Sequence, residues 1–130
     1  MKTLDSKTLI KLNHGAGLPL AVRIVLPAPE APSAASLEIE TAEIVISELF
    51  RLLPKKRLVG ITRWQEKKVI IKLFYQKLHW SRHLQREVNG LRNATNAAIP
   101  VPAMLASGIL EDGRGGYLIT EFLEGGYNLD

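Results

Sequence analysis

Two apolar runs separated by a short polar stretch give the clearest signal in the sequence. Residues 57–64 (Arg-Leu-Val-Gly-Ile-Thr-Arg-Trp) and residues 69–75 (Val-Ile-Ile-Lys-Leu-Phe-Tyr) are rich in β-branched and aromatic side chains, which favour strands. The polar residues 65–68 between them are few enough for a hairpin turn. The pattern predicts two antiparallel strands, of which the second is buried.

A helix is predicted over residues 81–98. Four side chains at spacings of four, three and four lie on one helical face: Leu84, Val88, Leu91 and Thr95. Ser81 or its neighbour is a candidate N-cap. The Ile-Pro-Val-Pro run at residues 99–102 ends the helix, because proline cannot continue the hydrogen-bond ladder.

Two further strands are predicted at residues 104–110 and 116–122, joined by the turn-forming residues 111–115. Residues 20–26 fit an edge strand, whereas residues 37–53 are apolar at many spacings and favour neither helix nor strand. The order of strand, hairpin, helix and hairpin predicts an α+β fold, with about five antiparallel strands and one long helix packed on them.

The chain of 130 residues fits one modest domain. Residues 27–36 are rich in Pro, Ala and Ser and cannot hold a regular element, so they predict a surface loop. We expect residues 1–36 to form an N-terminal preamble that ends in this loop, and residues 37–124 to form the folded body.

The apolar share (46%) and the charged share (23%) are those of an ordinary soluble globular protein. The absence of cysteine excludes a disulfide scaffold and thiolate metal sites, and fits a reducing cytoplasm. No run approaches the roughly 20 apolar residues of a membrane-spanning helix. His79 and His83 share a predicted helix face without an acidic cluster nearby, so no metal site is predicted.

Positive charge is concentrated between Arg51 and Arg92, where twelve Lys or Arg residues face only two acids. Such a surface favours an anionic partner, such as nucleotide phosphate, a phosphorylated glycolipid, the inner membrane leaflet or nucleic acid. Solvated lysines on an exposed hairpin explain it equally well. The aromatic residues of this region are not spaced as a stacking platform, which argues against nucleic acid; they are Trp64, Phe74, Tyr75 and Trp80.

Lys72 is the main candidate for chemistry. It stands within an apolar strand, where alternation places it on the face of Ile70 and Phe74. Burying an unpaired ammonium there would cost free energy. The lysine therefore needs an anionic partner, or its aliphatic stem must lie along the apolar surface so that its charge reaches water. Glu87 is the matching acid, because it shares the helix face that docks on the sheet. We expect the two side chains to form an ion pair.

Several segments together resemble a known family. They are residues 48–59, Trp64, residues 69–74, residues 82–91, residues 99–102 and residues 118–124. They resemble the eukaryotic-like protein kinase fold and, within it, the bacterial lipopolysaccharide kinases that phosphorylate heptose or Kdo sugars of the inner core. The resemblance covers about residues 43–130. It implies that residues 37–124 are a kinase-like N-terminal lobe and that residues 125–130 lead out of the hinge.

The resemblance also implies roles for single residues. Lys72 would contact the phosphates of ATP, with Glu87 as its partner in catalysis. Thr120 would be the gatekeeper, and Glu121, Phe122 and Leu123 the hinge, in which the Glu121 carbonyl and the Leu123 amide bond the adenine. The phosphate-covering loop matches residues 53–57 (Leu-Pro-Lys-Lys-Arg) and has no glycine. Three cations of this loop could contact phosphate through their side chains, although a solvated turn explains them equally well: Lys55, Lys56 and Arg57.

The chain ends shortly after the hinge, before any catalytic-loop or metal-binding aspartate of the fold. The resemblance implies an ATP-dependent kinase for an anionic sugar or lipopolysaccharide core acceptor, cytoplasmic or peripheral at the inner membrane. Its C-terminal lobe would supply the base, the Mg²⁺ ligands and the acceptor site. We expect this fragment alone to be inactive. The alternative is a non-catalytic module, either a pseudokinase-like or an anion-binding regulator.

Overall fold

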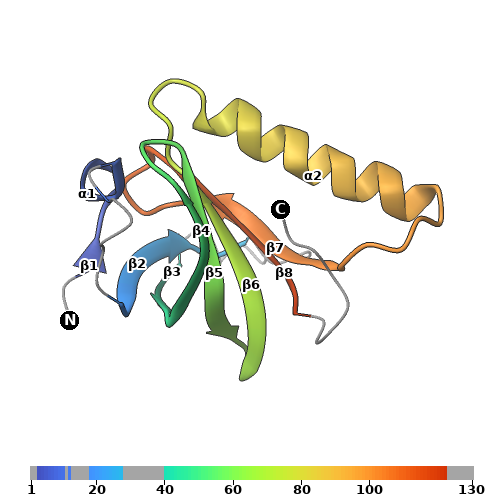
Figure 1. The fold of residues 1–130 in the computed structure, drawn as a ribbon, viewed down its shortest axis with the longest axis horizontal. Helices are drawn as coiled ribbons and strands as arrows, with labels where there is room; N and C mark the ends of the chain where they lie inside the picture. Colours follow the sequence, from blue (N-terminus) through green and yellow to red (C-terminus); the bar gives the residue numbers. More distant parts are fainter. Residues whose placement is uncertain (1–2, 11, 13–17, 28–39, 123–130) are drawn as a thin grey trace, which may run out of the picture.

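The computed structural model describes residues 3–10, 12, 18–27 and 40–122, and these form two sheets and one long helix (Figure 1). The elements in chain order are β1 (Thr3–Leu4), α1 (Ser6–Ile10), β2 (Leu20–Val25), β3 (Thr41–Ile46), β4 (Glu48–Leu53), β5 (Arg57–Trp64), β6 (Lys67–Phe74), α2 (Trp80–Asn96), β7 (Met104–Ile109) and β8 (Gly116–Glu121). The predicted α+β class is confirmed.

The larger sheet has five strands in the order β4-β5-β6-β8-β7, and every neighbouring pair is antiparallel. Strand β6 is central, and Lys72 lies opposite Val59 of β5 and Leu118 of β8. Helix α2 connects β6 to β7. After the helix, the β7–β8 hairpin returns to the same sheet, where β8 pairs with β6.

A second sheet was not predicted. It contains β1, β2 and β3 in that order, with β1 parallel and β3 antiparallel to β2. The prediction that residues 20–26 form an edge strand was wrong, because β2 is the central strand of this sheet. Its partner β3 comes from residues 37–53, whose apolar spacing favoured neither helix nor strand. That segment forms two strands, β3 and β4, which meet at Ser47.

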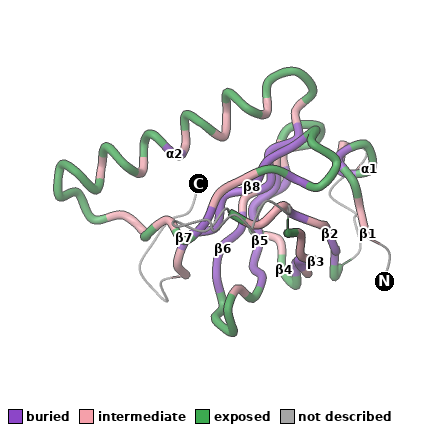
Figure 2. The backbone as a smooth tube through the Cα atoms, turned by 180° about the vertical axis from the view of Figure 1, so that it is seen from behind, coloured by how far each residue is buried: buried purple, intermediate pink, exposed green. Residues whose placement is uncertain are grey.

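The main core lies between the two sheets. Alternation along β6 sends Ile71 and Leu73 to the face that packs on Ile24 and Ile46 of the smaller sheet. All four side chains are fully buried, and Figure 2 shows buried backbone running through β2, β5, β6 and β8. The predicted preamble thus shares a core with the body, and the Tyr117 hydroxyl reinforces the contact by donating to the Val25 carbonyl (2.8 Å).

Helix α2 covers part of the opposite face of the larger sheet (Figure 1). Val88 of the helix packs with Phe74 and Leu118 of the sheet, and Leu84 and Leu91 flank this contact. The predicted helix face is confirmed at these three helical positions. Thr95 differs, because it is exposed and donates to the Leu91 carbonyl.

Two predicted boundaries needed correction. The helix begins at Trp80 after His79, which makes no side-chain cap hydrogen bond, so Ser81 is inside the helix and is not its cap. The β5–β6 connection is also shorter than the predicted residues 65–68, since β6 begins at Lys67. Gln65 and Glu66 turn the chain with positive φ values of 50° and 66°. Two positive φ values suit a two-residue hairpin, whose twist matches that of the strands.

Candidate functional site

Lys72 lies on the face of the larger sheet that α2 partly covers. Ile70 and Phe74, two residues away on either side, are buried on the same face, at 1% and 0% exposure. The lysine side chain is itself only 19% exposed. Its ammonium group therefore lies at the boundary between an apolar surface and solvent, where an opposite charge stabilises it.

Glu87 supplies that charge from α2. Its Oε2 atom lies 3.2 Å from Nζ of Lys72, and the side chain is 30% exposed. Glu87 is placed there because the next residue, Val88, is buried against the sheet and fixes the rotation of the helix. The predicted ion pair is confirmed. Alternation along the strand predicted the face of Lys72, and the spacing of apolar residues along the helix predicted the face of Glu87.

Arg57 is a third member of this cluster, and its pairing with Glu87 was not predicted from the sequence. Its Nη1 atom lies 3.4 Å from Oε1 of Glu87, so the carboxylate is shared by two cations. Arg57 opens β5, and its register partner is Phe74 on β6. Alternation from Val59 back to Arg57 places the arginine on the Lys72 face, so strand periodicity held the signal.

The loop expected to cover phosphate is a tight turn between β4 and β5. The Lys56 amide donates to the Leu53 carbonyl (3.0 Å), and the Tyr75 amide donates to the Lys56 carbonyl (3.0 Å). Lys55 has a φ of 66° and is exposed, as is Lys56. Lys56 lines a cleft that Glu87 also borders, whereas Lys55 is not among the lining residues.

The expected gatekeeper and hinge residues lie at the end of β8. Thr120 is 7% exposed and pairs with Ile70. Glu121 is held to the residue before β7: its amide donates to the Ala103 carbonyl (3.0 Å), and its Oε1 atom accepts from the Ala103 amide (2.8 Å). The side chain of Glu121 thus links β8 to the start of β7 at the end of the hairpin opposite the turn.

Phe122 packs on the apolar patch next to Lys72, formed by Val59, Ile61 and Ile70. The ammonium of Lys68 lies 4.7 Å from the centroid of the Phe122 ring, a favourable cation–π distance. Leu123, the third expected hinge residue, lies outside the described residues, as do residues 125–130. The structure therefore brings Thr120 and Phe122 to the Lys72 face of the sheet.

His79, directly before α2, and His83 within it have ring centroids 6.4 Å apart and planes tilted by 33°. Within the described part of the chain, no group of three or more His, Asp or Glu side chains is placed to hold a metal ion. No helix in that part is long and apolar enough to cross a membrane.

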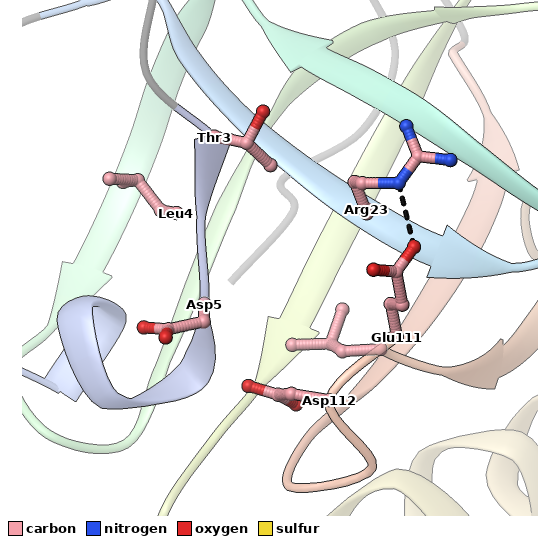
Figure 3. A pocket seen from close by; sticks show the side chains of 7 residues that line it. Thr3, Leu4, Asp5, Arg23, Glu111 and Asp112 are labelled. Carbon is pink, nitrogen blue, oxygen red and sulfur yellow. Dashed lines mark hydrogen bonds and ion pairs between the residues drawn. The ribbon is translucent and has the colours of Figure 1, made fainter.

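A second cleft, of about 150 Å³, lies where β1 meets the β7–β8 turn (Figure 3). Its charged side chains are engaged with one another or with backbone. Nε of Arg23 lies 2.6 Å from Oε2 of Glu111. Asp112 accepts hydrogen bonds from the amide (2.7 Å) and the hydroxyl (3.0 Å) of Ser6. These contacts attach the N-terminal segment to the larger sheet, and we assign them a structural role.

Comparisons with known proteins give no family for this chain. No protein-family model, curated protein or solved structure matches it significantly. The ion pair of Lys72 and Glu87 is therefore the main indication of function.

Proposed function

We propose that this chain is a kinase-like N-terminal lobe that binds the phosphates of ATP through Lys72. The observation that carries the proposal is the ion pair between Nζ of Lys72 and Oε2 of Glu87, at 3.2 Å. A strand lysine held by a helix glutamate is the arrangement with which protein kinases position nucleotide phosphates.

The charge balance of the cluster supports phosphate binding. Lys72 and Arg57 bring two positive charges to the single negative charge of Glu87. The cluster therefore keeps a net positive charge, which attracts an anion. Because Lys72 is 19% exposed and flanked by apolar side chains, hydrogen bonds from it to phosphate oxygens would be less screened than on an open surface.

The order of the elements also supports the proposal. A five-stranded antiparallel sheet with one long helix between its third and fourth strands in chain order is the arrangement we expect of a kinase-like N-terminal lobe. The apolar patch of Val59, Ile61, Ile70 and Phe122 lies on the same face as Lys72. It offers an apolar surface for the adenine ring, beside the expected hinge at Glu121 and Phe122.

Among the described residues, no group of three or more His, Asp or Glu side chains could hold a metal ion. In this fold the base and the metal ligands are expected from a C-terminal lobe. The role proposed for this chain is nucleotide binding. The proposed acceptor, a sugar hydroxyl of the lipopolysaccharide core, rests on the sequence resemblance alone.

Calorimetric titration with ATP, ADP and AMP tests the proposal. We expect affinity to rise with the number of phosphates, and Lys72→Met to weaken ATP binding about tenfold or more, since a hydrogen bond to a charged group contributes about 1.5–3 kcal/mol. Lys67→Met is the matched control, because Lys67 is on the same strand and exposed. Equal ATP affinity in the Lys72→Met and parent chains would refute the proposal.

A further inference from the structure

A basic cleft lies at the end of the larger sheet, between the β4–β5 turn and the beginning of α2. Its volume is about 400 Å³, and it is lined by Leu53, Lys56, Arg57, Gln76, His83, Arg86 and Glu87. The lining comes from the β4–β5 turn with the strand ends that flank it, from the β6–α2 connection and from α2, which the fold brings together from separate parts of the sequence. Lys72 does not line this cleft.

The positive charges of the cleft exceed the negative ones. Glu87 is the only acid in the lining, and it is already shared by Arg57 (3.4 Å) and Lys72 (3.2 Å). No acid in the lining is left to neutralise Lys56 and Arg86, both of which are exposed. A concave surface with this excess of cations concentrates anions from solution.

The cations of the cleft act together on the imidazole of His83, which also lines the cleft. Its imidazole is partly buried, and burial is the largest cause that lowers its pKa below the usual 6.5. The positive charges of Arg86, His79, Arg57 and Lys56 lower this pKa further. Of these groups, Arg86 of α2, Arg57 of β5 and Lys56 of the β4–β5 turn line the cleft, so cations from three elements act on the His83 imidazole.

The donors in the lining suit a tetrahedral oxyanion. An arginine presents parallel N–H groups that match two oxygens of a phosphate, and a lysine adds a compact positive charge. Gln76 and His83 add neutral N–H donors. Since the cleft is larger than one phosphate group, it has room for a small substituent on the ester oxygen, next to the apolar side chain of Leu53.

We propose that this cleft binds a dianionic phosphate group, free or as a monoester, through Lys56, Arg57 and Arg86 with His83 beside them. The cleft borders the nucleotide site proposed on the Lys72 face and shares Arg57 and Glu87 with it, but Lys72 does not line the cleft. A bound dianion would stabilise the imidazolium form of His83, which gives the site its own spectroscopic signal.

The test follows the His83 ring protons by NMR in the full chain. Sulfate, which stays dianionic between pH 5.5 and 8, is titrated against chloride at constant ionic strength, and we expect a saturable rise in the pKa of His83 with sulfate only. Inorganic phosphate is then titrated at fixed pH into the variants. Lys56→Gln and Arg86→Gln should each weaken binding by about tenfold, the loss of one charged hydrogen bond. Arg92→Gln, the same change on the same helix but outside this cleft, should leave it unchanged.

The remaining outcomes also decide the proposal. An unchanged His83 pKa, an equal response to chloride, or equal weakening by Arg92→Gln would overturn it. Lys72→Met should retain phosphate binding, and loss of binding in that variant would show that the phosphate uses the Lys72 face. Tighter binding of glucose 6-phosphate than of inorganic phosphate would assign the site to a monoester, and the reverse order would assign it to free phosphate.

Discussion

Nζ of Lys72 and Oε2 of Glu87 lie 3.2 Å apart, although Glu87 comes fifteen residues after Lys72 in the chain. Strand β6 and helix α2 each place one charge at the edge of a shared apolar contact. A double-mutant cycle with Lys72→Met and Glu87→Gln measures how far the two charges stabilise each other. We expect a coupling of about 0.5–1 kcal/mol in urea unfolding, because partly exposed ion pairs are screened by solvent. Additive single effects would contradict this pairing.

Arg57 competes with Lys72 for the same carboxylate, since its Nη1 atom lies 3.4 Å from Oε1 of Glu87. In an Arg57→Gln background the carboxylate is left to Lys72 alone. We expect the coupling between Lys72 and Glu87 to rise in that background by a few tenths of a kcal/mol, the scale of exposed ion pairs. The same cycle in an Arg63→Gln background is the control, because Arg63 is an exposed β5 residue outside this cluster. An equal rise in both backgrounds would mean that Arg57 acts through net charge only.

The pair of Lys72 and Glu87 could be predicted because each residue interrupts a regular apolar pattern. A charge within a strand run and a charge on an apolar helix face both need partners, and one pairing satisfies them. Arg57 could have been found by extending the alternation of β5 by one step. Its contact with Glu87 depends in addition on the rotation of α2 about its axis.

The smaller sheet could not be predicted in the same way. Its strands β2 and β3 pair across the residues between 25 and 41, and local periodicity carries no information about such a partner. The β5–β6 turn was misjudged because Gln65 and Glu66 adopt positive φ values that usually favour glycine or asparagine. Local sequence preference was overridden there by the pairing of the flanking strands.

Tyr75 and Tyr117 are both fully buried, but their hydroxyls differ. The Tyr75 hydroxyl has no hydrogen-bond partner among the described residues, whereas that of Tyr117 donates to the Val25 carbonyl. Leaving a buried polar group unpaired costs about 1–3 kcal/mol. We expect Tyr75→Phe to raise the free energy of unfolding by about 1 kcal/mol and Tyr117→Phe to lower it by a similar amount. Equal effects of the two changes in denaturant unfolding would contradict these assignments.

Burial of Tyr117 also predicts a change in stability at alkaline pH. Desolvation raises the pKa of Tyr117 from 10.0 to about 12. Between these values the unfolded chain loses the phenol proton while the folded chain keeps it, so ionisation favours unfolding as the pH rises. The contribution of Tyr117 is fully present below pH 10 and falls between pH 10 and 12. The free energy of unfolding of Tyr117→Phe should therefore fall less than that of the parent between pH 10 and 12. Parallel plots of this free energy against pH would show that the phenol has the same pKa in the folded and unfolded chains, which would contradict the prediction.

Gly60 and Gly90 give opposite predictions for the same change to alanine. A Cβ atom at Gly60 would clash with the Glu48 carbonyl oxygen and lie 2.7 Å from Cγ2 of Ile46, at the point where the chain passes from one sheet to the other. Since backbone must shift to admit it, we expect Gly60→Ala to lower the free energy of unfolding by about 1–3 kcal/mol.

Gly90 lies on the exposed side of α2, and a Cβ atom there would meet nothing within 4 Å. Alanine in a helix is about 0.5–1 kcal/mol more favourable than glycine, so Gly90→Ala should stabilise the chain by that amount. Urea unfolding of both variants checks the pair. Equal tolerance of Gly60→Ala and Gly90→Ala would contradict the close approach of β5 to the β3–β4 junction, which also positions the Arg57 end of β5.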